Sequence, residues 1–92
     1  MSYKNLEIYK LSYELALQVH RLTMKFPKHE MYEMGSQLRR AAVSVVLNIA
    51  EGYGRKAHQQ DFKSFLIHAL GSCNETAVLL RLANDLGYIS LE

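Results

Sequence analysis

The stretch that decides the fold is SQLRRAAVSVVLNIAEGYGR, residues 36–55, an almost unbroken apolar run between an arginine pair and a glycine-containing end. From Ala41 to Ala50 only Ser44 and Asn48 are polar. The run continues for about fifteen residues without a turn signal, which favours a helix. Its β-branched residues leave a strand as a minority alternative.

The apolar residues of this run fall on two faces of the predicted helix. Helical spacing places Leu38, Ala42, Val45 and Ile49 on one face and Val43, Val46 and Ala50 on the other. A three-helix arrangement covers only one face of such a helix. Either another helix or another subunit must therefore cover the second face.

A helix is predicted on each side of this run. Upstream, Asn5 is a candidate N-cap, and Pro27 ends an apolar stripe made of Ile8, Leu11, Leu15, Val19, Leu22 and Phe26. Downstream, the glycines of GYGRKA (52–57) interrupt the pattern, and Gly87 is a candidate C-cap. Between them a coiled-coil-like seam comprises Phe62, Leu66, Ala69, Cys73, Thr76, Leu80 and Ala83. We expect antiparallel helices at about 5–26, 33–52 and 58–86 in one all-α domain, residues 1–92.

Composition sets the remaining bounds. A chain of 92 residues forms one domain, and its net charge of +2 neither requires nor excludes a polyanionic partner. Cys73 is the only cysteine, which excludes an internal disulfide and fits a reducing cytoplasm. The N-terminus lacks the apolar core of a signal peptide, and no window approaches the roughly 18 apolar residues of a membrane span. We expect a soluble cytoplasmic protein.

The sequence contains no complete motif for catalysis or metal binding. It has no Glu-x-x-His pair of the di-metal helical bundles, and His29–Glu30 fails as a zinc-protease motif because position 33 is Glu. The G-x-G-x-x-A match at 52–57 follows a helix rather than a strand, and we interpret it as a helix-ending turn. Cys73 is expected to be a core thiol. We therefore predict no enzyme activity, no cofactor and no metal.

A line of polar residues runs between the apolar faces of the second helix: Gln37, Arg40, Ser44, Asn48, Glu51 and Arg55. One interpretation is a contact surface for a ligand or nucleic acid. The other is a hydrogen-bonded seam between helices, with Glu51 and Arg55 paired one turn apart. We favour the seam, because buried polar groups need partners. The alternative is a small-molecule-binding or catalytic bundle that uses Asn48 and Glu51.

Positive charge is concentrated between Arg21 and Arg40, where the sequence has five basic residues and two acidic ones. In a symmetric ring this excess would repeat and attract phosphates. The candidate nucleic-acid-binding residues are Arg21, Lys25, Lys28, Arg39, Arg55 and Lys56. RNA or DNA contact ranks below assembly in this interpretation.

Four segments together resemble a known family: FPKHE (26–30), residues 36–55, DFKSFLIHALGSCNET (61–76) and LANDLGYIS (82–90). The chain resembles the bacterial four-helix-bundle proteins named after the 23S rRNA intervening sequence. The most specific matches are Gln37, Arg39, Arg40, Ala41, Ser44, Asn48, Ile49, Ala50, Glu51, Gly52, Gly71, Ser72 and Glu75.

The resemblance implies an all-α, antiparallel up-and-down four-helix bundle that assembles as a ring-like homopentamer without established enzymatic activity. It also implies a relative, the accessory protein of diversity-generating retroelements, which binds a reverse transcriptase and nucleic acid. This chain offers only three long helices and at most the start of the fourth at 89–92. Leu91–Glu92 is equally compatible with a cloning remnant. Expected partners are other copies of the chain, and RNA, DNA or a reverse transcriptase.

Overall fold

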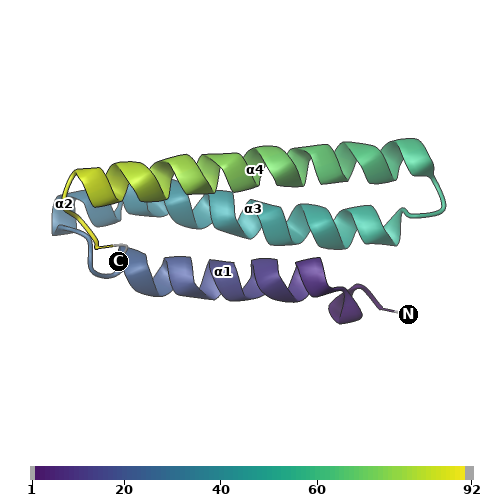
Figure 1. Cartoon of the computed structure of the whole chain (residues 1–92), viewed down its shortest axis with the longest axis horizontal. Helices are drawn as coiled ribbons and strands as arrows, with labels where there is room; N and C mark the ends of the chain where they lie inside the picture. The colour runs from purple at the N-terminus through teal and green to yellow at the C-terminus, as the bar shows by residue number, and fades with distance from the viewer. Residues whose placement is uncertain (1, 91–92) are drawn as a thin grey trace.

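Three long helices run antiparallel in the computed structural model, which describes residues 2–90 (Figure 1). They are α1 (Glu7–Thr23), α3 (Met34–Gly54) and α4 (Gln59–Asp85). A short 3-10 turn, η1 (Tyr3–Asn5), precedes α1, and the single-turn helix α2 (Lys28–Met31) joins α1 to α3. The predictions of an all-α fold and of three long helices are confirmed, and residues 2–90 contain no strand.

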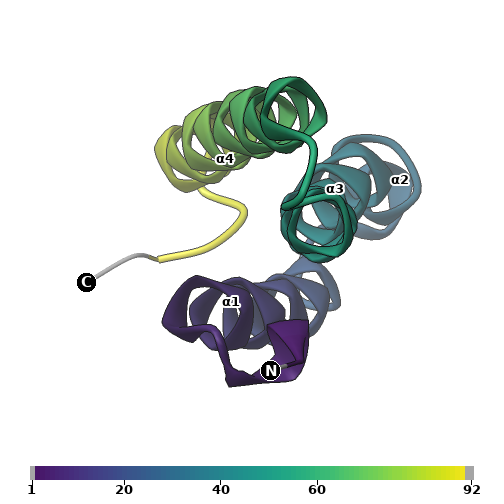
Figure 2. The same cartoon turned by 90° about the vertical axis from the view of Figure 1, so that its right-hand side faces the viewer.

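The helix α3 is the centre of the arrangement. Both α1 and α4 pack along α3, and Val19 of α1 and Leu79 of α4 belong to the same core cluster. Figure 2, which looks along the helices, shows α1 and α4 diverging from α3, so that one side of the bundle stays open. A closed four-helix bundle is not formed by residues 2–90.

The first apolar face of α3 is covered as predicted. Leu38 and Ala42 are fully buried, and Val45 and Ile49 are 6% exposed. The second face differs from the prediction, because Val46 is also buried and belongs to the same core cluster as Ala16 and Val19 of α1. Only Val43 and Ala50 of that face are partly exposed.

The start of α1 differs from the prediction. Asn5 lies in η1, and the N-cap position of α1 is Leu6, which makes no side-chain capping bond. The end of α4 follows the prediction, because Gly87 adopts a left-handed φ of 79°. There the Gly87 and Tyr88 amides donate to the carbonyls of Asn84 (3.0 Å) and Ala83 (2.9 Å), the bonding pattern of a Schellman motif.

Helix α3 continues through both glycines of GYGRKA, which were expected to interrupt it. Gly52 is buried against α4, and a Cβ atom placed there would lie 3.0 Å from the Cβ of Phe65. At this position glycine allows the close approach of two helices. Gly54 is the last residue of α3 and has open space around it.

The seam of α4 is only partly buried. Ala69, Thr76 and Ala83 are buried, as is Leu79, which the seam does not include. Cys73 is exposed, so the prediction of a core thiol is wrong. The reason is the open side of the bundle: Cys73 lines the groove between α1 and α4, which no helix of residues 2–90 fills.

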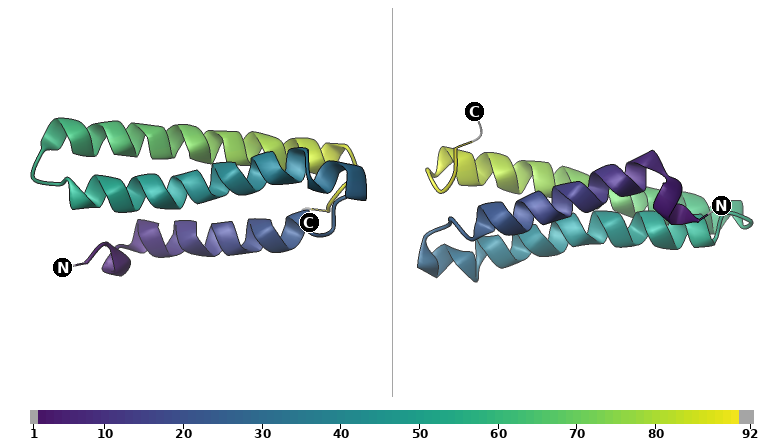
Figure 3. Two further views of the ribbon diagram at one scale, coloured as in Figure 1. Left: turned by 180° about the vertical axis from the view of Figure 1, so that it is seen from behind. Right: turned by 90° about the horizontal axis from the view of Figure 1, so that it is seen from below.

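The segment after α4 turns back toward α1. The rings of Tyr88 and Phe26 lie 5.6 Å apart, and Ile89 packs against the same core. Figure 3 shows this segment at the same end of the bundle as the end of α1 and the helix α2. The predictions for Leu91–Glu92 concern residues outside those that the structure describes.

Candidate functional site

The middle of the polar line forms a seam between α3 and α4. The Asn48 Nδ2 donates to the Ser44 carbonyl oxygen (2.8 Å) and to its Oγ (3.0 Å). The hydroxyl of Ser72 on α4 donates to the same Oγ at 2.8 Å. For these residues the interpretation as a hydrogen-bonded seam is confirmed, with Ser72 as the cross-helix partner.

The other members of the line lie on the outside. Gln37, Arg40 and Glu51 are exposed, and none makes a side-chain hydrogen bond or ion pair with residues 2–90. The predicted pair of Glu51 and Arg55 does not form.

Arg55 instead contacts the start of α4, because α3 ends one residue before it. Its Nη1 lies 3.6 Å from Asp61 Oδ2, and its guanidinium carbon lies 5.5 Å from the centre of the Phe65 ring. Arg55 therefore stabilises the connection between α3 and α4.

Arg39, the neighbour of Arg40, makes hydrogen bonds that connect α3 to α1 and α2. Its Nη1 donates to Thr23 Oγ1 at 2.8 Å and its Nη2 donates to the Met31 carbonyl at 3.1 Å. Thr23 is fully buried and donates in turn to the His20 carbonyl at 3.0 Å. Arg39 thereby ties the end of α1 and helix α2 to α3. A guanidinium committed in this way is a poor candidate for the phosphate contact that the sequence suggested.

Glycine makes room for this arginine. A Cβ atom at Gly35 would lie 3.2 Å from Arg39 Nη1. Sequence reasoning did not find the contact, although Thr23 lies at helical spacing between two other buried residues, Val19 of α1 and Phe26 just after it. A buried threonine hydroxyl needs a hydrogen-bond partner. From that requirement a nearby arginine could have been predicted as the partner of Thr23.

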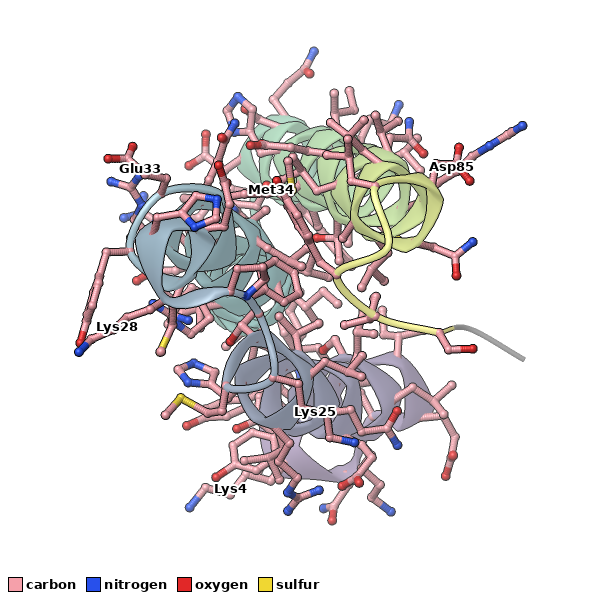
Figure 4. All side chains as sticks on the ribbon, turned by 90° about the vertical axis from the view of Figure 1, so that its left-hand side faces the viewer. Lys4, Lys25, Lys28, Glu33, Met34 and Asp85 are labelled. Atoms are coloured by element: carbon pink, nitrogen blue, oxygen red, sulfur yellow. The ribbon has the colours of Figure 1, made fainter. Side chains whose placement is uncertain are left out.

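The remaining basic candidates lie at the two ends of the bundle. Lys25 and Lys28 are exposed at the junction of α1 and α2, and Figure 4 shows both from that end. Arg55 and Lys56 follow the far end of α3, roughly 24 Å along the helix from position 39 at 1.5 Å per residue. Arg21 lies 3.9 Å from Glu14 in an exposed pair. The six candidates thus do not form one continuous surface.

Among the hollows on the surface of residues 2–90, two bear on function, and we name them the groove and the polar pocket. The groove, about 260 Å³, lies between α1 and α4 and is lined by Ile8, Leu11, Ser12, Leu15, Val45, Ile49 and Cys73. The polar pocket, about 500 Å³, lies on the outside of α3 beside α1 and is lined by His20, Ser36, Arg39, Arg40, Val43, Ser44, Leu47 and Asn48.

Two further observations concern residues 2–90. No helix in this range has the length and apolar character needed to cross a membrane. No three side chains of His, Cys, Asp or Glu in this range are grouped as a metal site.

Comparison with known proteins supports the family resemblance. No curated protein matches the chain. Residues 4–92 match the family model described as 23S rRNA-intervening sequence protein, a range that includes all three long helices and the Ser44–Asn48–Ser72 seam. The chain therefore belongs to the 23S rRNA-intervening sequence protein family.

Proposed function

We propose that the protein is a non-catalytic assembly module whose copies associate through the groove between α1 and α4. The observation that carries the proposal is the lining of this groove. Ser12 is its only hydroxyl-bearing lining residue, and that hydroxyl donates to the Tyr9 carbonyl at 2.9 Å. An apolar partner that binds in the groove therefore removes few polar groups from water.

The walls of the groove are unusually exposed for large apolar residues. Leu11 is 68% exposed and Ile8 is 50% exposed, although both belong to the apolar stripe of α1. Covering about 400 Å² of such surface is worth about 10 kcal/mol before the costs of association. That figure rivals the whole stability of a small domain. Association would then add substantially to the stability of the fold.

The occupant we propose is a helix of another copy. A helix along the groove would contact both α1 and α4 and complete the four-helix bundle that the family resemblance implies. The same resemblance favours a homopentamer, and repeated head-to-tail contacts between copies close into a ring when the rotation permits. A cytoplasmic location belongs to this proposal and rests on the single cysteine.

Multi-angle light scattering at micromolar protein tests the proposal. We expect the wild-type mass to be a multiple of the 10.6 kDa chain. Leu11→Asp should lower that mass while far-UV circular dichroism stays helical, because Leu11 is exposed in the single chain. Lys10→Asp is the matched control, since Lys10 is exposed next to Leu11 but does not line the groove. A stable, fully folded wild-type monomer would refute the proposal.

A second candidate function is association with RNA or DNA, either free or in complex with a reverse transcriptase. Lys25 and Lys28 favour it, because both are exposed and form no ion pair with residues 2–90. A ring would repeat this pair in every subunit. Binding through phosphates should weaken steeply as salt rises, because it releases condensed counterions.

A gel shift with structured RNA at several salt concentrations tests this second candidate. Replacing Lys25 and Lys28 together by Gln should weaken binding. It should also make the dependence of the logarithm of the binding constant on the logarithm of the salt concentration less steep, by about 1.8 for each chain that contacts the RNA, at about 0.9 per phosphate contact. Replacing Arg55 and Lys56 by Gln gives the same charge change at the other end. Equal effects of the two double variants, or binding insensitive to salt, would contradict the assignment.

A further inference from the structure

The polar pocket combines two arginine side chains and a histidine with an apolar floor. Arg39, Arg40 and His20 contribute to its lining, and no carboxylate does. Its volume of about 500 Å³ falls within the range of roughly 300–1,000 Å³ that is typical of small-molecule sites. A mainly apolar pocket with a few polar groups is also the usual composition of such sites.

Arg40 is the cation that is free to bind a ligand. Arg39 uses both terminal nitrogens on Thr23 and Met31. Arg40 is exposed and makes no hydrogen bond or ion pair with residues 2–90. Its guanidinium presents a planar fork of donors that matches the two oxygens of a carboxylate or phosphate. His20 faces the same pocket from α1 and adds a second donor.

The rest of the pocket favours an apolar body over a bare ion. Val43 and Leu47 lie one helical turn apart on α3, and Leu47 is 58% exposed. On the other side, the Asn48 amide nitrogen is already used on Ser44. On that side the Asn48 amide nitrogen is therefore not free to donate a hydrogen bond to a ligand.

We propose that the polar pocket binds a small organic oxyanion, an apolar body ending in a carboxylate or phosphate group. The oxyanion lies against Arg40 and His20, and the apolar body lies against Val43 and Leu47. None of the residues that line this site also lines the groove.

Backbone amide shifts measured by NMR on the full 92-residue chain test the proposal. The probes are 3-phenylpropionate and phenyl phosphate, with neutral 3-phenylpropanol and inorganic phosphate as matched comparisons. Both organic anions should shift the amides of Ser36, Arg40 and Leu47, and one binding better than the other identifies the headgroup. The alcohol and inorganic phosphate should each bind at least about tenfold more weakly, which corresponds to about 1.4 kcal/mol.

Two variants separate the site from general charge effects. Arg40→Gln should raise the Kd of the organic anions about tenfold, or about 1.4 kcal/mol. Arg21→Gln removes the same charge from an exposed arginine outside the pocket and should leave the Kd unchanged. Absence of shifts at the pocket amides, equal binding of the alcohol, binding of inorganic phosphate as tight as phenyl phosphate, or equal effects of the two variants would each overturn the proposal.

Discussion

The adjacent arginines of α3 allow a matched test of what holds α1 to α3. Arg39→Met keeps the apolar stem and removes the two donors that bind Thr23 and Met31. Hydrogen bonds to charged groups contribute about 1.5–3 kcal/mol each, and the partial exposure of Arg39 lowers that figure, so we expect a total loss of about 2 kcal/mol. For a domain of this size the Tm should fall by roughly 8–16 °C.

Arg40→Met is the control, because Arg40 is exposed and unpaired within residues 2–90. Its effect should stay within about 0.5 kcal/mol. Thermal melts followed by circular dichroism compare the variants at one protein concentration, since association would make the Tm depend on concentration. Equal losses for the two variants, or an unchanged Tm for Arg39→Met, would refute the reasoning.

Three further predictions concern positions on α3, and two of them compare matched pairs of residues. Val46→Asp should abolish the helical circular dichroism signal, at a cost above about 4 kcal/mol, because it places a charge in the core, whereas Leu47→Asp should preserve it. Gly52→Ala should lower the urea midpoint because its Cβ would lie 3.0 Å from Phe65, but Gly54→Ala, with open space, should raise stability by up to about 1 kcal/mol. Glu51→Gln should change the free energy of unfolding by less than about 0.5 kcal/mol, since Glu51 is exposed; loss of a defined reaction with unchanged Tm would count against a non-catalytic role.

Helical periodicity predicted the architecture well, because the buried face of α3 is set by local spacing alone. Leu38, Ala42, Val45 and Ile49 are all buried, as the spacing requires. Gly87 was predictable for the same local reason, since a left-handed residue is needed to end a helix in this way.

The errors arose where the outcome depends on a neighbouring element. The sequence does not show which of Arg39 and Arg40 lies inside, because that depends on how α1 crosses α3. Cys73 has the spacing of a core residue, yet it is exposed because its side of α4 has no covering helix in residues 2–90. Gly52 looked like a helix end, whereas the approach of Phe65 determines its role.

These corrections change which surface must be covered by assembly. The sequence placed the uncovered apolar face on α3, at Val43, Val46 and Ala50. In the structure α1 reaches far enough around α3 to bury Val46, and the large exposed apolar residues of the groove come from α1 instead. A charge at Val46 therefore reports on the fold of the single chain, because it disrupts the core itself. A charge at Leu11 reports on association, because Leu11 belongs to the surface that the single chain leaves uncovered.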